Sequence, residues 1–140
     1  MESTAARPVF IVGSPRSGTS ILTWCLGQHP NILPLDESTG LGKLTIALGT
    51  CYQTKMGLGE QSLWTAMDVQ KAEFFAAFGR VINEFILGHQ ADLERRRWEE
   101  AAGPMVSRDM FVANQSAKAR WVDGTPQYSD HIYGLRLLFP

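Results

Sequence analysis

Residues 9–20 read VFIVGSPRSGTS, and this stretch decides the fold that the sequence predicts. Its first four residues are a short apolar run ending at Gly13, which is typical of a buried strand in a parallel sheet. Glycine, serine and proline dominate residues 13–18 and predict a loop. Apolar residues then recur at helical spacing from about Thr19 to Gly27. Strand, glycine-bounded loop and helix in this order indicate an α/β protein.

The loop at residues 13–18 has the composition of an oxyanion site. A helix amino terminus exposes unpaired amides and carries positive partial charge, so anions bind there. Arg16 adds a fixed charge whose fork geometry suits phosphate or sulfate oxygens. Further hydroxyl donors are Ser17, Thr19 and Ser20. The segment nearly fits the nucleoside-triphosphate loop pattern, but Thr19 stands where lysine belongs. A chain reversal with no ligand is the plain alternative.

The rest of the chain continues the α/β pattern. Residues 29–34 read as a connector, and a helical stretch follows near 41–48. A long helix capped by Asp68 is expected next. Its predicted core stripe is Phe75, Phe78, Ile82, Phe85 and Ile86. Residues 108–118 are expected to be helical.

Near the carboxyl end, Trp121-Val122-Asp123 predicts a second strand, and Thr125-Pro126 predicts a helix start with threonine as the cap. Two short strands make a poor sheet. We therefore expect residues 1–140 to be a single, incomplete domain, the amino-terminal part of a longer protein.

Composition excludes several function classes. The net charge is -1 and no broad basic face is evident, which argues against a nucleic-acid partner. Arg95 to Arg97 have acidic neighbours and read as a solvated helix face. Cys25 and Cys51 have no metal-site spacing, and Cys25 is expected to be buried. No apolar run reaches membrane-spanning length and Met1 to Arg7 lack a signal-peptide core, so a cytoplasmic protein is expected.

Three landmarks carry a resemblance to a known family. Pro15 to Ser20 resembles the 5′-phosphosulfate loop of the PAPS-dependent sulfotransferases, which reads Pro, Lys or Arg, Ser, Gly, Thr, then Thr or Ser. Arginine in this loop is most similar to the tyrosylprotein and related bacterial branch. His29-Pro30 and an acidic turn follow as in that branch. Trp121 to Pro126 resembles a later Trp-x-Asp-Lys-Thr-Pro segment, and Phe139-Pro140 ends the next helix as in the family.

The resemblance implies a P-loop NTPase-like three-layer fold with a parallel sheet, here helix-rich and truncated. It implies a sulfotransferase that moves a sulfonyl group from PAPS (3′-phosphoadenosine 5′-phosphosulfate) to a hydroxyl or amine without a metal. The implied donor-binding residues are Ser14, Pro15, Arg16, Ser17, Gly18, Thr19 and Ser20.

The implied catalytic residues are Arg16 and Glu37. Glu37 takes the position of the family's base, eight residues after His29, and Asp36 is its nearest rival. A role in capping or facing solvent stays open for Glu37. Gly124 departs from the family, which carries lysine there. Residues for the 3′-phosphate are expected after Pro140, so we expect the chain alone to bind PAPS weakly and to transfer sulfate poorly or not at all.

Two other functions stay open. A nucleotide kinase or ATPase with a variant loop could use Asp123 to hold magnesium. A non-catalytic oxyanion-binding module could keep the loop without the chemistry. The acceptor is also open, between a small molecule, a carbohydrate, a lipid and a protein.

Overall fold

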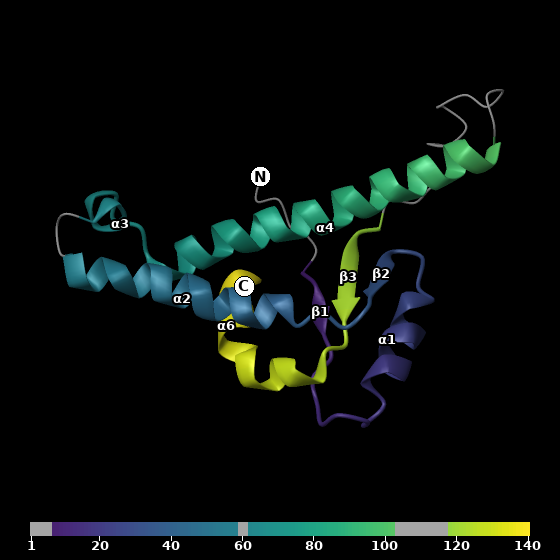
Figure 1. Ribbon diagram of the computed structural model, residues 1–140, viewed down its shortest axis with the longest axis horizontal. Helices are drawn as coiled ribbons and strands as arrows, with labels where there is room; N and C mark the ends of the chain where they lie inside the picture. The colour runs from purple at the N-terminus through teal and green to yellow at the C-terminus, as the bar shows by residue number, and fades with distance from the viewer. Residues whose placement is uncertain (1–6, 59–61, 103–117) are drawn as a thin grey trace.

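The computed structural model describes residues 7–58, 62–102 and 118–140 (Figure 1). Its elements, in chain order, are β1 (Val9–Phe10), α1 (Thr19–Gly27), β2 (Ile32–Leu35), α2 (Gly40–Leu58), α3 (Leu63–Ala66), α4 (Lys71–Ala102), β3 (Arg120–Asp123), the 3-10 helix η2 (Pro126–His131) and α6 (Ile132–Leu138). The helix expected over residues 108–118 falls almost entirely outside the described residues.

The three strands form one parallel sheet in the order β1-β3-β2. Phe10 of β1 and Leu35 of β2 both pair with Asp123 of β3, so the three strands end level with one another. A further bond from the Ile11 N–H to the Asp123 carbonyl, 2.9 Å long, extends the β1 pairing by one residue. The predicted α/β fold with a parallel sheet is confirmed, and so are strands at both predicted places.

The interpretation of residues 29–34 as a connector was wrong, because Ile32–Leu35 forms β2. Pro34 lies inside this strand and pairs with Val122. Proline has no N–H for a ladder, so it is found on edge strands. Within the described sheet β2 pairs with β3 alone, which makes it an edge strand where proline is tolerated.

In Figure 1, α1 lies on one side of the sheet and α2 and α6 lie on the other, while α4 crosses near the start of β3. Trp121 has no exposed surface, and its Nε1 donates a 2.8 Å hydrogen bond to Asn83 Oδ1 of α4. Helices α2, α4 and α6 share a buried core, which contains Leu48, Phe74, Phe75 and Leu138. The same bond and core therefore fix α4 against both the sheet and α6.

Helix α4 begins later than predicted, at Lys71. Its start is capped by Glu73, whose carboxylate accepts from the Gln70 N–H at 3.0 Å, and not by Asp68. Phe75 of the predicted stripe is buried, but 39% of Phe78 and 68% of Phe85 is exposed. Helical spacing fixes which residues share a face, but it does not tell how far along the helix a neighbour covers that face.

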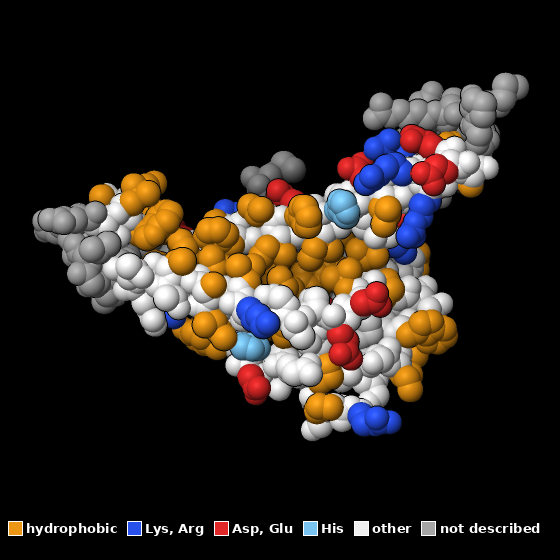
Figure 2. Space-filling model, in the orientation of Figure 1, with side chains coloured by type: hydrophobic (Ala, Val, Ile, Leu, Met, Phe, Trp, Pro, Cys, Tyr) orange, Lys and Arg blue, Asp and Glu red, His pale blue; other side chains and the backbone are white. Residues whose placement is uncertain are grey.

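Two surface predictions had different outcomes. Cys25 is exposed, so the expectation that it is buried was wrong: α1 contacts the sheet through its threonine side, where Thr19 and Thr23 are buried. The basic run on α4 lies on a charged surface, as predicted, with acidic and basic side chains side by side (Figure 2). Arg95 pairs there with Asp92 at 3.2 Å and with Glu99 at 3.1 Å.

Candidate functional site

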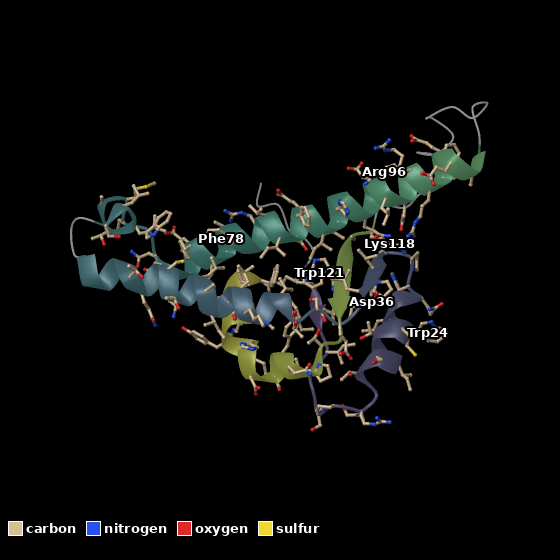
Figure 3. The ribbon with its side chains drawn as sticks, viewed as in Figure 1. Trp24, Asp36, Phe78, Arg96, Lys118 and Trp121 are labelled. Carbon is tan, nitrogen blue, oxygen red and sulfur yellow. The ribbon has the colours of Figure 1, made fainter. Side chains whose placement is uncertain are left out.

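The site lies where the three strands end. Ligands of open α/β sheets bind outside the carboxyl ends of the strands, because the connecting loops meet there. Three segments follow the strand ends: residues 11–18 after β1, residues 36–39 after β2 and residues 124–125 after β3. Figure 3 shows Asp36 beside the end of β3, with Trp24 on the neighbouring helix α1. The sheet therefore brings together segments that are far apart in the sequence.

The loop after β1 contains a tight turn with an unusual backbone. The Ser17 N–H donates to the Ser14 carbonyl at 3.2 Å, which closes a four-residue turn with Pro15 and Arg16 at its centre. Arg16 has φ 63, in the left-handed region. Proline second and a positive φ third define a type II turn, in which glycine or asparagine is usual at the third position. A left-handed arginine costs about 1–2 kcal/mol, and such strain is found at ligand sites.

The amino terminus of α1 follows this turn. Its first helical bond runs from the Leu22 N–H to the Gly18 carbonyl at 3.0 Å. Gly18 has φ 91 and contributes no side-chain cap, and no acidic residue stands in the first turn. The amides of residues 19–21 therefore have no partner within the helix, which is the arrangement that binds an oxyanion.

A pocket of about 290 Å³ opens beside α1. Its lining residues are Ser20, Thr23, Trp24, Pro34, Leu35, Asp36, Glu37 and Gly124. Ser20, the last residue of the predicted phosphate loop, thus shares a pocket with Glu37, the predicted base. Ser14, Pro15, Arg16, Ser17 and Gly18 are exposed on the loop and do not line the pocket, and Thr19 is buried. The rival base Asp36 lines the same pocket.

A family model described as the sulfotransferase family matches residues 8–140. The chain belongs to the sulfotransferase family. Searches of curated proteins and of solved structures found no match. Sulfonyl transfer is the chemistry that this family shares, and the strand, loop and helix at residues 9–27 stand within the matched region. Among the described residues, no helix is both long and apolar enough to cross a bilayer.

Behind the pocket of this member of the sulfotransferase family, a buried polar network joins the strand ends. Asp123 and Thr125 have no exposed surface. Asp123 Oδ1 accepts from the Thr125 N–H at 2.9 Å and from Thr125 Oγ1 at 2.6 Å, while Oδ2 accepts from Ser38 Oγ at 2.6 Å. Tyr128 Oη lies 2.8 Å from Ser38 Oγ. We call Ser38, Asp123, Thr125 and Tyr128 the Ser38 network.

The Ser38 network corrects two expectations. Thr125 precedes η2, as predicted for a cap, but its side chain donates to Asp123 and makes no capping bond. Asp123 is buried and accepts hydrogen bonds on both carboxylate oxygens, so it is not placed to hold the magnesium of a kinase or ATPase. Within the described part of the chain, no group of three or more His, Cys, Asp or Glu residues could hold a metal ion.

Tyr128 has a shifted pKa. Burial raises the pKa of this phenol above its ordinary value of 10.0, and the nearby Asp123 carboxylate adds to the shift. The neutral phenol is therefore favoured, and it keeps a proton to donate within the network.

Gly124, where the family carries lysine, packs against α1. A Cβ placed on Gly124 would lie 2.0 Å from Thr23 Oγ1 and 3.3 Å from the Thr19 carbonyl oxygen. Thr23 Oγ1 itself donates to the Thr19 carbonyl at 2.9 Å. A side chain at position 124 therefore competes for space with the threonine face of α1.

Sequence reasoning missed four residues of this site. Thr23 and Trp24 were assigned to an ordinary helix, and Ser38 and Tyr128 received no role. Their sequence signal is weak, because serine, threonine and tyrosine recur in many turns and helices. The parallel pairing of β2 with β3 identifies Ser38, because it places Ser38 next to Asp123. Thr23 and Trp24 are identified by their place on α1 beside Gly124 and the pocket.

Proposed function

We propose that the chain is a PAPS-dependent sulfotransferase whose loop at residues 13–20 holds the 5′-phosphosulfate. Family membership supports sulfonyl transfer, and the uncapped amides of α1 with the strained Arg16 turn supply donors suited to the donor's oxyanions. The single observation that carries the proposal is the shared pocket of Ser20 and Glu37. The arginine loop favours the branch that resembles tyrosylprotein sulfotransferases.

The proposed chemistry needs a base and a group that stabilises developing charge. When bound, PAPS supplies the sulfonyl group, which passes to the acceptor oxygen or nitrogen as the bond to the 5′-phosphate oxygen breaks. Glu37 accepts the proton that the acceptor loses. Arg16 and the Ser20 hydroxyl, with the amides at the start of α1, stabilise the negative charge that grows on the leaving phosphate.

The acceptor enters on the side of Trp24 in this proposal. Trp24 lines the pocket and is 64% exposed, so its ring is available to stack on an acceptor. Asp36 and Glu37 are the charged residues of the lining, which disfavours a polyanionic acceptor. Small molecules, carbohydrates, lipids and proteins that bear a hydroxyl or an amine all remain within this class.

The test is sulfonyl transfer from labelled PAPS to a panel of neutral and cationic hydroxyl and amine acceptors. Glu37→Gln should lower kcat by about 10²–10⁴-fold, because glutamine cannot take the proton. Glu84→Gln is the matched control, since Glu84 is exposed on α4 and far along the chain from the site. If Asp36→Asn abolishes transfer and Glu37→Gln does not, the base has been misassigned.

Arg16→Ala distinguishes this proposal from its alternatives. A sulfotransferase should lose both PAPS binding and transfer with this change. Tolerance of Arg16→Ala, with PAPS binding unchanged, would instead indicate a non-catalytic module that keeps the loop as a scaffold. Magnesium-dependent hydrolysis of ATP would indicate the kinase or ATPase class.

A further inference from the structure

Ser38 follows the proposed base Glu37 and is hydrogen-bonded through both its N–H and its Oγ. Its N–H donates to Thr125 Oγ1 at 2.8 Å, and its carbonyl oxygen lies 3.3 Å from the same hydroxyl. Its Oγ donates to Asp123 Oδ2 at 2.6 Å and contacts Tyr128 Oη at 2.8 Å.

The number of hydroxyl protons fixes which group donates in each hydrogen bond of the Ser38 network. Each hydroxyl has one proton to donate. Ser38 Oγ uses its proton on Asp123, so Tyr128 Oη must donate to Ser38 Oγ. Thr125 Oγ1 is closer to Asp123 Oδ1, at 2.6 Å, than to the Ser38 carbonyl, so its proton also points to Asp123. The buried carboxylate therefore organises every hydroxyl of the network, and charge-assisted bonds of this kind are strong.

The network sets the position of Glu37. The Ser38 N–H belongs to the peptide unit whose carbonyl is that of Glu37, so the bond to Thr125 fixes the plane of that peptide. Asp123 and Thr125 flank Gly124, which lines the same pocket as Asp36 and Glu37. The Ser38 network thus ties together two of the segments that line the pocket.

We propose that Ser38 is the positioning residue of the active site: its bonds to Asp123 and Thr125 hold Glu37 at the distance from Ser20 and Gly124 at which it can take the acceptor's proton. This inference rests on the proposed function. Ser38 itself touches no reacting atom, so its effect is on the rate of the chemical step and not on donor binding.

The experiment compares Ser38→Ala with the wild-type chain in the PAPS transfer assay. A small misplacement of a catalytic group costs about 10²-fold, so kcat should fall by about 10–100-fold. PAPS affinity, measured by calorimetry, should change less than about twofold, because the loop at residues 13–20 is untouched. Ser38→Thr keeps the hydroxyl and should restore most of the rate.

Two further variants control for misfolding and for general destabilisation. Ser38→Cys preserves the volume but offers a weak donor, so it should also lower kcat if Ser38→Ala does not fold. Asn83→Ala removes the buried partner of Trp121, near the start of β3 and away from the Ser38 network. It should destabilise the fold comparably and leave kcat unchanged at temperatures where the chain is folded.

The outcomes separate this inference from the proposed function. Loss of transfer in Glu37→Gln but full kcat in Ser38→Ala and Ser38→Cys would overturn the positioning role alone. An equal fall in kcat for Ser38→Ala and Asn83→Ala would also overturn it, because the effect would then be general destabilisation. Full activity of Glu37→Gln would overturn both.

Discussion

Replacing Gly124 with alanine should destabilise the protein through one identifiable contact. The new Cβ would lie 2.0 Å from Thr23 Oγ1, well inside contact distance, in a fully buried position. Thr23 cannot move freely, because it is itself buried and its hydroxyl is bonded to the Thr19 carbonyl. Either this bond breaks or α1 shifts away from the end of β3.

The magnitude follows from two opposing terms. Extra atoms in a packed interior cost about 1–3 kcal/mol. Gly→Ala recovers about 0.4–1 kcal/mol by reducing the freedom of the unfolded chain, since the φ of Gly124 is not in the left-handed region. The net loss should be about 1–2 kcal/mol. Thr23→Ala removes the clashing oxygen, so adding Gly124→Ala in that background should be nearly neutral.

The assay is a double-mutant cycle on positions 23 and 124. Urea unfolding of the four proteins, followed by tryptophan fluorescence, gives the free energy of unfolding of each. We expect a coupling energy of at least about 1 kcal/mol between the two changes. If the two effects simply add, within about 0.5 kcal/mol, the steric reasoning is refuted.

The same cycle bears on the family's lysine. Gly124→Lys alone should destabilise the fold more than alanine does, because its Cβ meets the same oxygen. In the Thr23→Ala background the lysine should fit, and its effect on kcat then measures what a cation at this position adds. We expect a rate increase if Arg16 carries the charge stabilisation alone in the wild-type chain.

Three further predictions concern other parts of the chain. Arg16→Gly should raise the free energy of unfolding by about 1 kcal/mol, because glycine adopts a φ of 63 without strain. The same change should weaken PAPS binding, measured by calorimetry. A variant that is less stable and binds PAPS equally well would contradict both expectations. Gly88→Ala should stabilise α4 by about 0.5–1 kcal/mol, because nothing lies within 4 Å of the new Cβ. In the same helix Gly79→Ala should destabilise strongly in thermal unfolding, because its Cβ would overlap the Leu138 carbonyl; equal effects of the two would show that α4 and α6 are not in close contact. Because the pKa of Tyr128 is raised in the folded protein, the phenol contributes stability that is fully present below pH 10.0. Above pH 10.0 the unfolded chain loses the Tyr128 proton before the folded protein does, so this contribution is lost as the pH rises. Tyr128→Phe should therefore flatten the fall in stability above pH 10.0 in alkaline urea titrations.

Much of the fold could be predicted where local sequence and tertiary structure agree. The strand at Val9, the helix from Thr19 to Gly27 and the strand at Trp121 have strong local signals, and the structure contains all three. Strand β2 was not predicted, because a proline such as Pro34 argues against a strand in the interior of a sheet. A proline is acceptable only when the strand is known to lie at the edge. That knowledge comes from its pairing with β3, which is a long-range property.

Some residues of the candidate site could be predicted from the sequence and others could not. Ser20 and Glu37 follow from the resemblance, and the structure places both in one pocket. Whether they act as proposed is for the transfer assay to decide. Ser38 and Thr23 could not be found from the sequence, since their importance comes from contacts with Asp123 and Gly124 across 85 and 101 residues of chain. Periodicity reports which face of a helix is apolar, and it carries no information on such pairings.

The strand order has a consequence for synthesis on the ribosome. The middle strand of the sheet, β3, is the last of the three to be made, and it pairs with strands from the first quarter of the chain. Contacts at such separations form slowly, and a chain synthesised at about 5–20 residues per second waits several seconds for β3. Until then the segments after β1 and β2 have no shared strand to align them. The pocket at the strand ends should therefore form late, in one step, when β3 inserts between the two strands made before it.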